Sequence, residues 1–164
     1  TRSALLQRDG DVVELDGISP ITFAATPGSY HVAVRHRNHL GVMTAAPLAL
    51  GTVPVSIDFR NTATSTYGVQ AQKQIGSVMA MWAGDVVHQV PPGILKYAGS
   101  ENDRDAILLA VGGSTPTTTI IGYGPEDVNM DGTVKYTGSN NDRDPVLVNI
   151  GGSVPTNIRA EQLP

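Results

Sequence analysis

Apolar and polar positions alternate along much of the first part of the chain. The stretch "GSYHVAVRH", residues 28–36, places Tyr30, Val32 and Val34 on one face of an extended strand. "VPVSIDFR", residues 53–60, alternates in the same way. Between earlier strands, "RDGD" predicts a hairpin turn. Short strands separated by turns are typical of β-sandwiches, so this pattern predicts a mainly β protein with a sandwich module over residues 1–75.

The pattern changes over residues 76–164, where the sequence repeats itself. Residues 96–117 and 135–156 align without a gap at an offset of 39, and 14 of these 22 positions are identical. With their flanking residues, the copies extend over about 82–117 and about 123–156. Two copies are too few for a solenoid, so they predict a pair of units packed on each other.

Each copy contains "NDRD" followed by an apolar run, "AILLAV" in the first copy and "PVLVNI" in the second. Asn is a good N-cap, acids suit the first turn of a helix, and Gly151 suits the end of one. Each copy therefore predicts one helix. The apolar positions that match at the offset of 39 predict packing between the helices through Ile107, Leu108, Val111, Val146, Leu147 and Ile150.

Directly before the second "NDRD", oxygen-bearing side chains recur at every second residue. With Asp127 as position 1, Asn129 is position 3, Asp131 is position 5 and Thr133 offers its carbonyl at position 7. Gly132 stands at position 6, where a calcium loop of the EF-hand type bends sharply. This half of the pattern predicts a calcium site.

The acid expected at position 12 is missing, because Gly138 stands there. If "KYTGSN" is treated as an insertion, Asn141 takes position 9 and Asp144 takes position 12. Asp142 then competes with Asp144 for the closing ligand position. The predicted ligand set is Asp127, Asn129, Asp131, the Thr133 carbonyl and Asp144, with Asp142 nearby.

The first copy keeps less of this pattern. Asp85 aligns with Asp127, but Val87 and Gln89 stand at positions 3 and 5, and prolines interrupt the loop. Asp103 and Asp105 are retained on the helix side. These three acids predict a second, weaker calcium site; the alternative is that Asp103 and Asp105 only cap a helix.

Composition narrows the class of protein. The net charge is −4 and the pI about 5.4, which does not favour nucleic-acid binding. There is no cysteine, which excludes disulfides and thiolate metal sites, and no apolar run long enough to span a membrane. Motifs for hydrolases, zinc proteases and nucleotide binding are missing. His31 and His36 fall on opposite faces of the predicted strand, which disfavours a metal shared between them.

Three resemblances refine the fold. "PGSYHVAVRH" resembles the Gly-x-Tyr strand of prealbumin-like or Ig-like sandwich modules. Without "KYTGSN", the second repeat resembles a dockerin repeat, a calcium loop followed by one helix and used in tandem. The whole chain resembles the C-terminal region of large secreted surface proteins of Bacteroidetes-type bacteria, in "RSALLQRDGDVVELDGISPITF", "YHVAVRHRNHLGVM", "AQKQIGSVMAMWAGD" and "DVNMDGTVKYTGSNNDRDPVLVNIGGSVPTNIRAEQLP". The last resemblance implies an extracellular or cell-surface setting and no catalysis.

The predicted function is a non-enzymatic structural module that calcium stabilises. In the similar surface proteins another strand usually precedes "TRSALL", which predicts a groove open to strand addition. Candidate donors are "TRSALLQ" and the tail "SVPTNIRAEQLP", with Val154 and Ile158 as anchors. Its partners would be copies of itself or neighbouring modules, and "STPTTT" can carry O-glycans. Two alternatives are a dockerin-like module that recruits a protein partner and an accessory carbohydrate-binding domain of a secreted enzyme.

Overall fold

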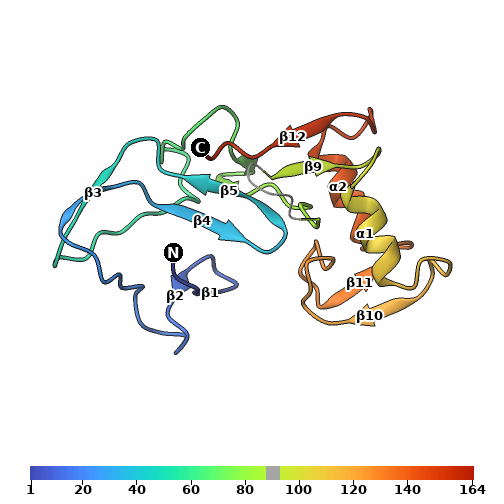
Figure 1. Cartoon of the computed structure of the whole chain (residues 1–164), viewed down its shortest axis with the longest axis horizontal. Coiled ribbons are helices and arrows are strands. Elements are labelled where there is room, and N and C mark those ends of the chain that lie inside the picture. The colour runs from blue at the N-terminus through green and yellow to red at the C-terminus, as the bar shows by residue number, and fades with distance from the viewer. Residues whose placement is uncertain (88–92) are drawn as a thin grey trace.

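The computed structural model describes residues 1–87 and 93–164, and the chain is mainly β, as predicted. Helices α1 and α2 lie together with β9–β12 in one half, and the strands of the first part of the chain form the other half (Figure 1). The elements in chain order are β1 (Leu5–Leu6), β2 (Val12–Val13), β3 (Gly28–Tyr30), β4 (Ala33–His36), β5 (His39–Met43), β6 (Leu48–Leu50), β7 (Lys73–Ile75), β8 (Val78–Ala80), β9 (Ile94–Lys96), α1 (Asp103–Ala110), β10 (Thr119–Ile121), β11 (Thr133–Lys135), α2 (Arg143–Asn149) and β12 (Ile158–Ala160).

The strands pair as small antiparallel sheets. Within the described residues there are six two-stranded sheets, namely β1–β2, β3–β6, β4–β5, β7–β8, β9–β12 and β10–β11. The predicted "RDGD" hairpin is present, with Gln7 N–H donating to the Asp11 carbonyl (2.8 Å). In this part of the chain the pairs do not join into two larger facing sheets, so the predicted β-sandwich over residues 1–75 is not confirmed.

The strand predicted for residues 53–60 is wrong, because these described residues contain no strand. Pro54 has no N–H to donate to a neighbouring strand. Asp58 accepts hydrogen bonds from the backbone N–H (2.9 Å) and the side chain (3.0 Å) of Arg60, which bends the chain into a turn. Val53 stays 75% exposed. Local turn chemistry therefore outweighs the alternating pattern here.

The main apolar core lies between the two repeats. It consists of Leu40, Val86, Leu95, Ile107, Val111, Val128, Val134, Val146 and Ile150. The six positions predicted for helix packing lie in this cluster or against it; four are buried, and Leu108 and Leu147 are half-buried. Leu40 comes from β5, so the β4–β5 hairpin shares the core of the repeat unit.

Both helices begin with the same pair of hydrogen bonds. At α1, Asn102 Oδ1 accepts from the N–H of Asp105 (2.9 Å) and its Nδ2 donates to the Asp105 carboxylate (2.8 Å). At α2, Asn141 and Asp144 repeat these contacts at the same distances. In each pair, the first bond satisfies one backbone N–H that the first turn leaves without a helical partner, and the second joins the two side chains. Gly151, with φ of +119°, follows the C-cap of α2.

The C-terminal tail folds back on the first part of the chain. β12 pairs antiparallel with β9, and Glu161 directly after it is buried. The Glu161 carboxylate accepts hydrogen bonds from Gly41 N–H (2.9 Å), Gly93 N–H (3.3 Å) and the Arg35 guanidinium (3.1 Å). The C-terminus therefore lies near β5 (Figure 1). One carboxylate ties together the tail, β5 and the residue before β9.

The predicted domain boundary after residue 75 falls inside a hairpin. β7 and β8 lie on either side of it and pair from Lys73 with Ala80 to Ile75 with Val78.

In the part of the chain that the structure describes, neither helix has the length and apolar character that crossing a membrane requires.

Candidate metal centre

The second acidic loop, residues 127–133, is held by hydrogen bonds to its own backbone. Asp127 is fully buried; its Oδ1 accepts from Asp131 N–H and its Oδ2 from Gly132 N–H, each at 3.1 Å. Asn129 Oδ1 accepts from Asp131 N–H (2.8 Å), and Asp131 Oδ1 accepts from Thr133 N–H (2.9 Å). Gly132 has φ of +83°, the left-handed conformation that a sharp bend needs. The alternate polar side chains therefore turn back onto the loop.

Asp142 closes this loop from the start of α2. Its side chain is fully buried, with Oδ1 accepting from Asn129 N–H (3.1 Å) and Oδ2 from Lys135 N–H (2.7 Å). The Asp142 N–H donates to the Lys135 carbonyl in return (2.9 Å). Burial raises the pKa of Asp142, and the charge of Asp127 adds to this, against the lowering effect of the backbone N–H groups. Two buried carboxylates thus hold opposite ends of one loop.

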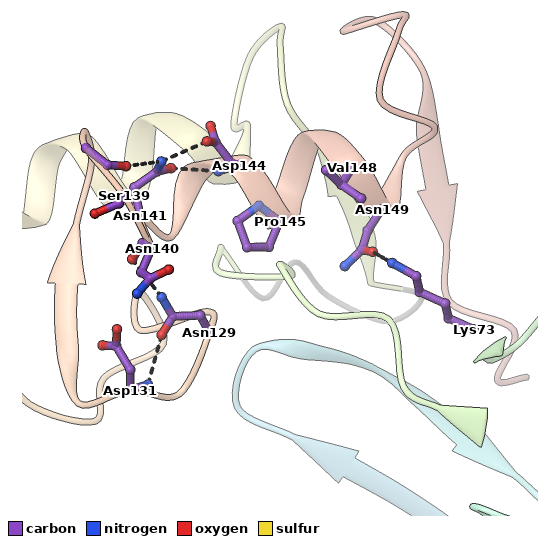
Figure 2. Close-up of a pocket in the computed structure, with 11 residues that line it drawn as sticks. Lys73, Asn129, Asp131, Ser139, Asn140, Asn141, Asp144, Pro145, Val148 and Asn149 are labelled. Carbon is purple, nitrogen blue, oxygen red and sulfur yellow. Dashed lines mark hydrogen bonds between the residues drawn. The ribbon is translucent and has the colours of Figure 1, made fainter. Parts of the chain in front are cut away.

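Asp144, the predicted ligand at position 12, lies elsewhere. Its side chain is 56% exposed and accepts from Asn141 Nδ2 (2.8 Å) and Arg143 Nη2 (3.0 Å). The hydrogen bond from Asn141, and the contact with Arg143, lower the pKa of Asp144. Figure 2 shows Asp144 beside Asn141, with Asn129 and Asp131 at the other end of the same pocket. Loop closure falls to Asp142, and Asp144 belongs to the helix cap.

The residues treated as an insertion, 135–140, take part in this arrangement. Lys135 ends β11; its N–H donates to Asp142 Oδ2, and its carbonyl accepts from the Asp142 N–H. These two hydrogen bonds close the loop, so a spacing that leaves Lys135 out also leaves out the closure. The Arg143 guanidinium lies 5.2 Å from the ring centre of Tyr136. The equivalent pair in the first repeat is 5.1 Å apart. The "KY" pair therefore has the same structural role in both repeats.

In the first repeat, Asp103 takes the place of Asp142. Its Oδ1 accepts from the N–H groups of Val86 (2.7 Å) and Val87 (3.0 Å), and its Oδ2 accepts from Lys96 N–H (2.7 Å). Burial raises the pKa of Asp103 to about 6, and the charge of Asp85 contributes in the same direction. Asp85 is also buried, at 4% exposed. Asp85 and Asp103 are thus brought together as Asp127 and Asp142 are.

Asp105, the third acid predicted for the weaker site, is not part of this pair. It is 55% exposed and bonds to Asn102 and Arg104 at the start of α1, the same contacts that Asp144 makes in α2. Val87 carries no side-chain oxygen, and Gln89 and the prolines that follow lie outside the described residues. The described part of this loop therefore offers fewer oxygens than the second loop.

A hairpin turn from the first part of the chain reaches both loops. Asn38, between β4 and β5, is fully buried, and its Nδ2 donates to the carbonyls of Pro125 (3.0 Å) and Asp127 (2.7 Å). The Asn38 carbonyl accepts from the N–H groups of Gly84 (2.8 Å) and Asp85 (3.2 Å). Sequence reasoning gave Asn38 no role, because these partners lie far along the chain and no motif links them.

Arg37, beside Asn38, places a cation near the second loop. Its Nη2 lies 4.0 Å from Asp127 Oδ2, and its Nε donates to the Gly124 carbonyl (3.1 Å). The Arg37 side chain is 33% exposed, so solvent screens this charge in part. Arg37 offsets some of the negative charge at Asp127.

The oxygens of the second loop suit calcium, which takes six to eight oxygen ligands. Asp127, Asp131 and Asp142 offer carboxylates, Asn129 an amide oxygen and Thr133 its carbonyl. Among the described residues, no group of three or more His, Cys, Asp or Glu side chains is gathered closely enough to hold a metal ion. A bound ion would therefore need the amide, backbone and water oxygens as well as the acids. Burial of two neighbouring carboxylates favours such an ion.

An open pocket of about 660 Å³, lined by polar residues together with Pro145 and Val148, lies beside this loop and α2 (Figure 2). Asn129 and Asp131 line one end of it, and Asn149 lines the other, where Lys73 Nζ donates to Asn149 Oδ1 (2.9 Å). Three of the predicted ligands, Asn129, Asp131 and Asp144, thus border this open pocket.

The residues of the site are interpreted from this chain itself. Comparison with models of protein families, with curated proteins and with solved structures gives no match.

Proposed function

We propose that the chain is a non-enzymatic structural module of the cell surface or extracellular space, stabilised by calcium at the second loop. The observation that carries this proposal is the pair of fully buried carboxylates, Asp127 and Asp142, at the two ends of one loop. Their like charges disfavour the folded loop at neutral pH unless a cation balances them. Asn129, Asp131 and the Thr133 carbonyl supply further oxygens in the spacing of a calcium loop.

Calcium here would act as a structural lock. The loop lies between β10 and β11, and Asp142 begins the turn into α2; Val128 of the loop and Val146 of α2 both lie in the core. An ion that joins Asp127 to Asp142 therefore holds the second repeat onto the core that it shares with the first. At a calcium concentration 100-fold above the Kd, binding stabilises the fold by about 2.7 kcal/mol.

Thermal unfolding with calcium and with a chelator tests the lock. The melting temperature is expected to fall on chelation, and Asp131→Ala, at an exposed ligand position, should remove most of that sensitivity. Asp16→Ala is the matched control, because Asp16 also accepts from backbone N–H groups in an exposed turn but lies outside the loop. A wild-type melting temperature that is the same in calcium and in chelator would rule out the calcium lock.

The module assembles with copies of itself by exchanging the C-terminal strand. β12 is a short terminal strand, and β9 in the described residues pairs with β12 alone. The tail of a neighbouring chain can make the same contacts to β9 and place its own Glu161 against Gly41 and Gly93. Ile158, which was expected to anchor the tail, is 59% exposed on this strand, so the backbone pairing with β9 and the buried Glu161 would hold the exchanged tail. An exchange that runs head to tail does not close, so it produces a filament.

A reversible crosslink tests the exchange. Lys96 and Ile158 are partners in the β9–β12 register, and the chain has no cysteine, so Lys96→Cys with Ile158→Cys creates a single possible disulfide. Oxidation of dilute monomer should lock the tail in its own chain and prevent assembly, and reduction should restore it. Filaments that form equally well from the locked monomer would contradict strand exchange.

A second candidate, a module that recruits a protein partner through its helices, has one observation in its favour. Leu109 of α1 and Val148 of α2 occupy equivalent repeat positions and are 75% and 57% exposed. Two matched apolar side chains on the surface suit a partner that contacts both helices. If they form such a surface, Leu109→Ser with Val148→Ser should abolish association without changing the calcium-dependent melting temperature.

The carbohydrate-binding alternative gains no such support. Trp82, the single tryptophan, donates its Nε1–H to the Gln70 carbonyl, and the Arg159 guanidinium lies 3.5 Å from its ring centre. One face of the Trp82 ring is therefore already used by Arg159.

A further inference from the structure

The turn between β4 and β5 brings two histidines together. His36 ends β4, His39 begins β5, and they are direct partners in the strand register. Their Nδ1 atoms are 2.9 Å apart, and the ring planes meet at 77°. Asn38 Oδ1 lies 2.7 Å from Nδ1 of His39. His39 Nδ1 thus lies within 3 Å of two other atoms that can each offer a lone pair, His36 Nδ1 and Asn38 Oδ1.

No placement of the protons on two neutral imidazole rings makes all three of these close contacts hydrogen bonds. Asn38 Oδ1 only accepts, because the Asn38 amide nitrogen is fixed by two backbone carbonyls, so it requires a proton on His39 Nδ1. Arg37 Nη1, 3.2 Å from His36 Nε2, only donates, so it requires the proton of His36 on Nδ1. In two neutral rings these protons would then point at each other across 2.9 Å. At least one of these three contacts is therefore not a hydrogen bond between neutral rings and their neighbours.

We propose that His36 Nδ1, His39 Nδ1 and Asn38 Oδ1 bind one divalent transition-metal ion, Cu(II) or Ni(II), at a site separate from the calcium loop. Imidazole suits these ions, whereas calcium takes oxygen ligands. With ligand nitrogens 2.0–2.1 Å from the ion, a separation of 2.9 Å corresponds to an angle of about 90° at the ion. A tetrahedral zinc site would need about 3.3 Å between the nitrogens. Right angles are typical of tetragonal copper and nickel complexes.

The neighbouring groups set the free-energy cost of binding. Arg37 opposes a bound cation and must turn away from His36 Nε2, which carries the ring proton once Nδ1 binds the ion. Asp127, 4.0 Å from Arg37 Nη2, offers the guanidinium another partner. Removing the charge of Arg37 should therefore tighten metal binding.

Copper titration of the full chain tests the site, with calcium kept in excess so that the acidic loops do not take up the added ion. Calorimetry should give one Cu(II) per chain, and electron paramagnetic resonance should show a tetragonal signal with imidazole nitrogen couplings. His36→Gln should weaken binding at least about tenfold, since even ligand-supporting groups change affinity 10–100-fold. His31→Gln is the control, because His31 is exposed and its Nδ1 contacts the Thr44 carbonyl (2.8 Å).

Two results would overturn the proposal. One is copper affinity that is the same in the wild type and in His36→Gln, and the other is an equal loss of affinity in His31→Gln. Each variant is first compared with the wild type by circular dichroism. If His36→Gln fails to fold, Arg37→Gln decides, because it leaves all three ligands in place. That variant should bind copper more tightly, and an unchanged or lower affinity would contradict the proposed site.

Discussion

Asp142→Asn removes one of the two negative charges of Asp127 and Asp142 at the second loop while preserving the shape of the side chain. Without calcium we expect a small effect on stability, because burial raises the pKa of Asp142 and so disfavours its ionised form in the folded chain. Removing that charge offsets the hydrogen bond that is lost where the new amide nitrogen meets a backbone N–H, a cost of about 1–3 kcal/mol. With calcium, the variant lacks a closing carboxylate.

The expected magnitude follows from ligand linkage. Calcium at 100-fold its Kd stabilises the wild type by about 2.7 kcal/mol, or roughly 5–11 °C for a chain of this size. If Asp142→Asn weakens binding about 100-fold, the same calcium concentration adds only about 0.4 kcal/mol, or about 1 °C. The difference is well above the precision of a melting experiment.

Asp144→Asn is the matched control, two residues away and chemically identical. Its side chain is 56% exposed and caps α2, so we expect a loss of about 0.3–1 kcal/mol from the missing charge in the first turn. The calcium-induced shift should stay at its wild-type size. Both variants and the wild type are melted by circular dichroism in calcium and in chelator, after calorimetry has fixed the wild-type Kd.

The reverse outcome would refute this reasoning. If Asp144→Asn loses the calcium shift and Asp142→Asn keeps it, the loop closes in the register that treats "KYTGSN" as an insertion, and the closure observed at Asp142 does not describe the calcium-bound loop.

Three further predictions follow from the same contacts. Ile107→Ala should lower the free energy of unfolding in urea by about 2–5 kcal/mol, since the side chain is 0% exposed, while Leu109→Ala, 75% exposed on the same helix, should change it by less than about 0.5 kcal/mol. In chelator, the melting temperature should fall as the pH rises from about 4 to about 7, because burial raises the pKa of Asp103 to about 6 and the unfolded chain releases this proton near 3.8; Asp103→Asn should flatten this slope, and a melting temperature that rises instead would contradict the assignment. Asn38→Ala should weaken calcium binding in calorimetry, because the Asp127 carbonyl loses its donor; an unchanged Kd would show that the hairpin does not support the loop.

Internal repetition was the most informative feature of the sequence. The match at an offset of 39 predicted two helices and the apolar positions between them, and Ile107 and Val146 are both fully buried in one core. Repeated residues meet the same neighbours in both copies, so local pattern and tertiary contact agree. The turn over residues 127–133 could be predicted for a similar reason, because its hydrogen bonds join residues at most five positions apart.

The remaining features depend on contacts between distant segments. Asn38 is 89 residues from Asp127, and Arg35 is 126 residues from Glu161, so no local spacing could indicate either pair. The predicted sandwich rested on alternation, on the spacing of strands and turns and on one strand resemblance, and in residues 53–60 a turn at Asp58 overrode the alternation. The other obstacle was the spacing across "KYTGSN". The sequence alone could not decide whether Asp142 or Asp144 closes the loop.

The two repeats together show what "NDRD" contributes without any metal ion. In both copies the Asn and the second Asp cap the helix, and the first Asp, Asp103 or Asp142, accepts hydrogen bonds from the backbone on either side of the loop. A carboxylate in this position closes the loop whether or not the loop binds an ion, so the repeated "NDRD" by itself does not indicate calcium. The indication comes from the preceding residues, where the second copy has Asn129 and Asp131 and the first has Val87 at the position of Asn129. A copy that keeps the closing carboxylate but not these oxygens can fold through its N–H donors, and burial raises the pKa of its closing residue, Asp103, to about 6. We therefore expect calcium to act on the second repeat and the protonation of Asp103 to act on the first, and the chelator and pH experiments address these two effects separately.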